Sequence, residues 1–75
     1  MKLRDKDVEN LIRWLGERRD ELKDSIKETF VSLKNRLKRE DWDVSIVDCE
    51  TLIELLTDLA TTELVLEKIK NLVEE

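Results

Sequence analysis

Apolar residues recur at helical spacing along most of the chain, with one short polar interruption at Arg39-Glu40-Asp41. In the first part they are three, four or seven positions apart, which places them on one face of an α-helix. These positions are Val8, Leu11, Ile12, Leu15, Leu22, Ile26, Phe30, Leu33 and Leu37. Asp5 or Asp7 can cap the start of this helix, and the basic residues near position 38 suit its C-terminus. The pattern predicts a helix over residues 6–39.

The second part of the chain carries a broader apolar pattern. A strict seven-residue series with a partner series between its members reads as the a and d positions of a coiled coil. The series are Leu52, Leu59, Leu66 and Val73, and Leu55, Thr62 and Ile69. Ser45 and Asp48 fit an S-x-x-D capping box. We therefore expect a turn over residues 40–43 and a helix over 44–74, with a break at 60–62 as the alternative; the uninterrupted heptad favours continuity.

Two helices of matched length predict a single all-α domain over residues 1–75, folded as an antiparallel helical hairpin. Two helices share only one seam, however, and Trp14 and Val31 lie off the main stripe of the first helix. Exposed apolar surface of this extent marks an interface, and chains this short usually need a staple or a partner subunit. We expect a homodimeric four-helix bundle. The alternative is a small monomeric three- or four-helix bundle bent near Gly16 and Thr61.

Charge divides the chain in the same place. Residues 1–40 carry about +3 and residues 41–75 about −8, which gives the net charge of −5. The acidic helix then neutralises the basic one across the hairpin. One cysteine, Cys49, is typical of a reducing compartment, and we expect a cytoplasmic protein with no signal peptide and no membrane-spanning segment.

Residues suited to catalysis are scarce. The chain has no His and no Tyr, so the usual general bases near neutral pH are missing and nothing activates Cys49 or the serines. Acidic residues line one face of each helix, but the paired motifs of all-α nucleotide pyrophosphohydrolases are absent. These residues are Glu17, Glu21, Asp24 and Glu28, and Glu50, Glu54 and Asp58. We interpret them as solvated, salt-bridged faces, and expect no enzyme, no catalytic residue, no metal site and no cofactor.

The leading functional hypothesis is a protein–protein interaction or regulatory module that acts as a small helical homodimer. The large apolar residues of the second helix are expected at the oligomer interface. They are Leu52, Leu55, Leu59, Leu66, Ile69 and Val73. Trp14, Arg18 and Val31 are the candidates for contact with an unidentified protein partner.

Two other functions are weighed against this hypothesis. The first is RNA or DNA binding through the mildly basic first helix, where Lys6, Asn10, Arg13 and Trp14 are suitable residue types. In this respect the layout resembles plasmid copy-number repressors, dimers of helical hairpins that bind paired RNA loops through their first helices. Net negative charge opposes binding to a polyanion, so nucleic acid is not the expected partner. The second is an acidic inhibitor whose second helix imitates a phosphate backbone.

Overall fold

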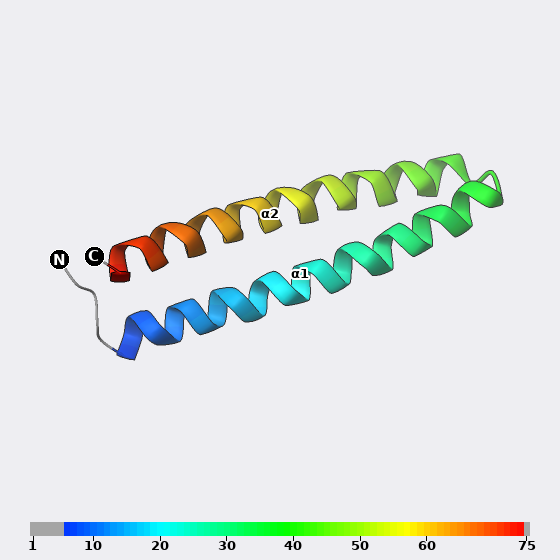
Figure 1. Cartoon of the computed structure of the whole chain (residues 1–75). Helices are drawn as coiled ribbons and strands as arrows, with labels where there is room; N and C mark the ends of the chain where they lie inside the picture. The colour runs from blue at the N-terminus through cyan, green and yellow to red at the C-terminus, as the bar shows by residue number, and fades with distance from the viewer. Residues whose placement is uncertain (1–5, 75) are drawn as a thin grey trace.

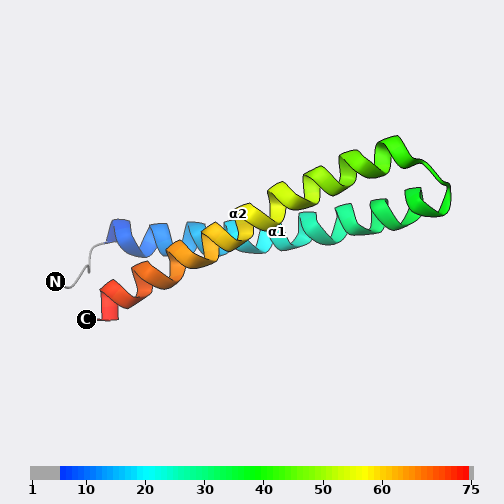
Figure 2. The same cartoon turned by 90° about the horizontal axis from the view of Figure 1, so that it is seen from above.

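The structure is a computed structural model that describes residues 6–74, and it contains two long helices joined by a tight turn (Figure 1). Helix α1 spans Lys6–Lys38 and helix α2 spans Trp42–Glu74, each 33 residues long. The helices run antiparallel side by side, so the ends far from the turn lie together (Figures 1 and 2). The antiparallel helical hairpin expected from the sequence is confirmed.

The turn stops α1 by a hydrogen-bonding pattern that usually requires glycine. The N–H of Asp41 donates to the carbonyl of Arg36, and the N–H of Glu40 donates to the carbonyl of Leu37. This pair of bonds is a Schellman motif, whose penultimate residue adopts the left-handed conformation. Glu40 occupies that position with φ of 60°. The Asp41 carbonyl then accepts from the N–H of Ser45, so Asp41 is the N-cap residue, directly before α2.

The seam between the helices follows a heptad pattern on both of them. Along α2 the side chains that face α1 are spaced three and four apart, and all of them are buried or half-buried. They are Ser45, Asp48, Leu52, Leu55, Leu59, Thr62, Leu66, Ile69 and Val73. The matching positions of α1 are Val8, Ile12, Leu15, Arg19, Leu22, Ile26, Thr29, Leu33 and Arg36. Four leucines form the core, Leu15, Leu22, Leu33 and Leu66, and each contributes about 1.5–3 kcal/mol by burial.

Two details of the sequence analysis are wrong. The Ser45–Asp48 pair does not cap α2, because that helix already begins at Trp42 and both residues face α1. Phe30 and Leu37 do not lie in the seam, where Thr29 and Arg36 take the heptad positions; they are 52% and 43% exposed.

Both helices are continuous where bends were considered. A Cβ atom added at Gly16 would have no neighbour within 4 Å. No close approach of another segment therefore requires glycine at this position, and α1 continues through it. Thr62 donates its hydroxyl to the carbonyl of Asp58 within the same helix, and α2 passes through residues 60–62 unbroken. The alternative of three or four shorter helices is therefore excluded for the described residues.

Candidate functional site

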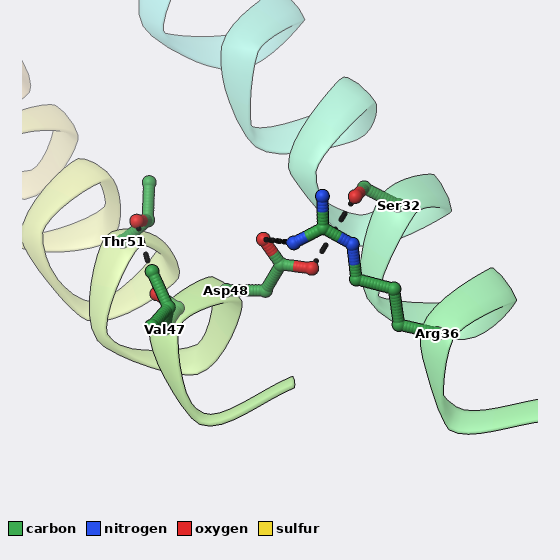
Figure 3. A network of polar contacts seen from close by, with 5 residues as sticks. All are labelled: Ser32, Arg36, Val47, Asp48 and Thr51. Atoms are coloured by element: carbon green, nitrogen blue, oxygen red, sulfur yellow. Dashed lines mark hydrogen bonds and ion pairs between the residues drawn. The ribbon is translucent and has the colours of Figure 1, made fainter. Parts of the chain in front are cut away.

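The turn half of the seam holds a polar cluster (Figure 3). The guanidinium Nη1 of Arg36 lies 3.3 Å from Asp48 Oδ1, and the Ser32 hydroxyl donates to Asp48 Oδ2 at 3.3 Å. Both partners come from α1, so one carboxylate of α2 is held by two residues spaced one helical turn apart. The Asp48 side chain is 12% exposed and that of Arg36 is 37% exposed. The pair is therefore shielded from water on one side and open on the other.

This cluster is suited to fixing the register of the hairpin. Both carboxylate oxygens of Asp48 are already engaged, and no histidine stands between that carboxylate and Ser32 to activate the hydroxyl as a nucleophile. A partly buried ion pair adds little net stability, but it disfavours alignments that leave one charge unpaired. One turn earlier in α2, the buried Ser45 Oγ has no hydrogen-bond partner, which costs stability.

A second feature is the apolar surface of α2 that does not face α1. Its members continue from the start of the helix with spacings of four and three residues, which is again a heptad pattern. They are Trp42, Ile46, Cys49, Ile53, Leu56 and Ala60, and we call this set the outer stripe. All six are exposed; Trp42 reaches 60% and Ile53 65%. The outer stripe is thus an ordered row of apolar side chains left open by the hairpin.

An open groove of about 510 Å³ lies farther along, where α1 and α2 approach their free ends. Its walls alternate basic and acidic side chains over the buried Leu66. They include Arg19, Lys23 and Lys70, and Glu63 and Glu67. The mixed charges and the open form provide no selective site for one ligand class.

The structure separates the residues predicted for binding. The six expected at an oligomer interface, from Leu52 to Val73, all lie at seam positions against α1; Leu66 is 4% exposed and the other five are half-buried. Their role between subunits stays a prediction. Trp14 and Arg18 are exposed one turn apart on α1. Val31 lies about 26 Å from Trp14 along that helix and is 57% exposed.

The predictions from the sequence do not include the outer stripe as a second heptad, and they omit Trp42. The signal was present, because every outer-stripe residue from Ile46 to Ala60 follows a seam position by one residue. The acidic residues that line one face of each helix were expected to form salt bridges. In the described part of the chain, ion pairs join Arg19 to Asp20 and Arg36 to Asp48, and none of those acidic residues takes part in them.

Three further findings limit the kinds of site. Among residues 6–74, no group of three or more His, Cys, Asp or Glu side chains is arranged to hold a metal ion. Neither described helix is long and apolar enough to cross a membrane. Comparisons with protein-family models, with curated proteins and with solved structures find no match.

Proposed function

We propose that the protein is a non-enzymatic protein–protein interaction module that acts as a homodimer of helical hairpins. The observation that carries this proposal is the balance of its apolar residues. Of the large hydrophobic side chains in the described residues, fourteen are exposed and four hydrophobic residues are buried. A monomer that leaves this much apolar surface in water has a strong drive to associate.

The shape of the hairpin supports the same proposal. Its extents are 55 × 14 × 13 Å and its radius of gyration is 16.8 Å, whereas a compact chain of this length has a radius of about 11 Å. The accessible surface is 5981 Å², against about 4,800 Å² for a compact monomer of this mass. One rod cannot cover itself, and a second rod alongside it removes the excess.

A non-enzymatic role is supported by the chemistry of the polar groups. The Asp48 cluster is occupied by its own partners, and the groove near Leu66 places cations and carboxylates in alternation. Neither arrangement presents a free nucleophile next to a base, which acid–base or covalent catalysis needs.

Sedimentation equilibrium tests the proposal directly. Over about 1–100 µM, a range that covers common homodimer affinities, we expect a mass of twice 8.9 kDa. A single species of 8.9 kDa at the highest concentration would contradict the homodimer.

A titration with RNA and DNA, in duplex and loop forms, separates this function from nucleic-acid binding. Because the net charge is −5, we expect no saturable mobility shift at low or at moderate salt. Tight binding that weakens steeply with salt, as counterion release requires, would favour a nucleic-acid-binding protein instead.

A further inference from the structure

The outer stripe has a fixed geometric relation to the seam. Ile46, Cys49, Ile53, Leu56 and Ala60 each follow a seam residue by one position, which rotates the stripe by about 100° around α2. A helix with two heptad seams at nearly a right angle is what a corner of a square four-helix bundle requires, because each corner helix has two neighbours. One of the two neighbours of α2 is α1. The outer stripe marks the place of the other.

Helix α1 contributes to the same face. Phe30 and Leu37 also follow seam positions by one residue, after Thr29 and Arg36. Antiparallel helices turn in opposite senses when they are viewed from one end, so this one-residue offset points to the same side of the hairpin on both helices. Phe30, Leu37 and the outer stripe therefore lie on one face beside the turn, and Lys27 and Lys34 share its α1 side. The opposite flank of the seam is polar over its middle part, where it carries Ser25, Ser32, Thr51, Glu54 and Asp58. Its exposed apolar residues lie outside this part, with Val44 and Val47 next to the turn and Leu11, Trp14, Val65 and Leu72 toward the free ends.

We propose that this face binds a second copy of the chain, with the two α2 helices antiparallel. The proposal rests on the homodimer proposed above and specifies its surface and direction. In the register that centres the two stripes on each other, Trp42 meets Ala60 of the second copy, and Ile46 meets its Leu56. The largest side chain then lies against the smallest one, as close packing requires.

Charge selects the same direction. Beyond Ala60 the heptad positions of the outer stripe are taken by Glu63 and Glu67. Parallel α2 helices would bring each of these carboxylates onto its own copy, which is unfavourable. In the antiparallel register Glu63 instead reaches the level of Arg39 in the turn of the second copy. The pairing of opposite charges at both ends of the stripe favours this alignment.

The antiparallel dimer also covers α1. Its two-fold axis is perpendicular to the helices and keeps both α1 helices on one side, so they become neighbours in the bundle. Because Asp48 lies opposite Ser32 and Arg36, Phe30 is at the level of the middle of the stripe. The two Phe30 rings then meet near the axis. In a parallel dimer the α1 helices would lie on opposite sides and Phe30 would stay in water.

The face has the size of a stable interface. The six large side chains on it are 43–65% exposed and leave on the order of 600 Å² of surface per copy. Standard stable interfaces bury about 800 Å² per partner, and Leu52 and Leu59, half-buried seam residues next to the stripe, add to the buried area. Two elements oppose the contact. Glu50 meets its own copy at the edge, and Lys27 of α1 comes within one residue of the level of Lys34 in the second copy.

Mixed-chain disulfide formation tests surface, direction and register together. One chain is the wild type, with Cys49 as its single cysteine. The other carries Cys49→Ser and Ile53→Cys. The antiparallel register places position 49 of one chain against position 53 of the other. The Cα atoms of position 49 in the two chains are then about 8–9 Å apart, and so are those of position 53, which is beyond the reach of an unstrained disulfide.

After mixing under a glutathione redox buffer, we expect the disulfide between unlike chains to exceed both like-chain products at least tenfold. Dominant like-chain disulfides would overturn the antiparallel direction while leaving the homodimer intact. If sedimentation shows a dimer but neither product forms above the level of a denatured control, the surface is wrong. A monomer in sedimentation contradicts the homodimer itself.

A matched pair of charge variants gives an independent test of the surface. Ile53→Asp places a charge in the centre of the stripe, and Val47→Asp places the same charge on the far side of the same helix. Both residues are more than half exposed, at 65% and 55%, so neither change opens the hairpin core. We expect Ile53→Asp to raise the dimer dissociation constant more than 100-fold and Val47→Asp to change it less than threefold. Equal effects of the two variants would overturn the proposed surface.

Discussion

The two sides of α2 differ in polarity, and over the first half of the helix the more apolar side is the exposed one. Over the first half of α2, the side that packs on α1 begins with Ser45 and Asp48, both less than 9% exposed. The side that faces solvent carries Trp42, Ile46 and Ile53, each 57% exposed or more. In a self-sufficient domain the apolar residues would occupy the covered side. The comparison shows that, in this half of α2, polar residues begin the covered side and the larger apolar side chains lie on the open side.

The two ends of the seam also differ from each other in polarity. Near the turn, Asp48 ties α2 to Ser32 and Arg36. Toward the free ends, Leu15, Leu22 and Leu66 provide the apolar core. The polar end is held by directional contacts, and the apolar end is held by packing. Variants at the two ends of the seam and in the turn are therefore expected to change stability by different amounts.

Leu22→Ala breaks the packed end of the seam. Leu22 is 3% exposed, the most buried residue of the core, so removing three carbons leaves a cavity as well as losing burial. We expect the free energy of unfolding to fall by about 3 kcal/mol. Urea unfolding at fixed protein concentration measures the change. Leu64→Ala, at a leucine that is 52% exposed, is the control and should cost less than about 1 kcal/mol.

Asp48→Ala breaks the polar end. It removes the acceptor of two hydrogen bonds and leaves Arg36 and Ser32 without their partner. We expect a loss of about 2 kcal/mol, less than for a fully buried pair because Arg36 can turn toward water. The same urea experiment applies, with Asp43→Ala, on the exposed first turn, as the comparison. A loss no greater than that of Asp43→Ala would show that the cluster does not hold the turn end of the seam.

Glu40→Gly improves the turn without touching either side of α2. Glu40 has a left-handed backbone with φ of 60°, which costs a residue with a side chain about 1–2 kcal/mol. Glycine removes that cost and loses part of the gain through its freer unfolded state. We expect a net gain of about 1 kcal/mol, seen as a higher melting temperature. Glu40→Ala keeps the left-handed strain and serves as the control, so equal melting temperatures for the two variants would contradict this explanation.

Ser45→Ala makes the polar end of the seam more like the outer stripe. The Ser45 Oγ is buried and has no hydrogen-bond partner, so its removal relieves an uncompensated polar group. We expect a gain of about 0.5–1 kcal/mol, the smallest effect of the series. Calorimetric melting at equal concentration measures it. A loss of stability would mean that this hydroxyl has a partner in solution, for example an ordered water.

The sequence predicted the hairpin because its heptads are long and its helix breakers are few. The start of α2 and the composition of the seam were harder to predict. Ser45 and Asp48 match a capping box as a local motif, yet Asp41 is the N-cap because the Schellman turn at Glu40 fixes where the second helix can begin. Phe30 was placed in the seam because it is large and apolar. Its neighbour Thr29 takes that position because the seam of α2 selects one heptad register of α1, which no local pattern specifies.

The dependence of the melting temperature on protein concentration tests most directly whether a second copy covers the outer stripe. Folding coupled to dimerisation raises the melting temperature with concentration, whereas a monomer melts at one temperature. Across about a hundredfold range of concentration, which changes the association term by about 2.7 kcal/mol, we expect the wild-type midpoint to rise by several degrees. We expect the Val47→Asp midpoint to rise in parallel and the Ile53→Asp midpoint to stay constant. A wild-type midpoint that does not move over this range would contradict the account.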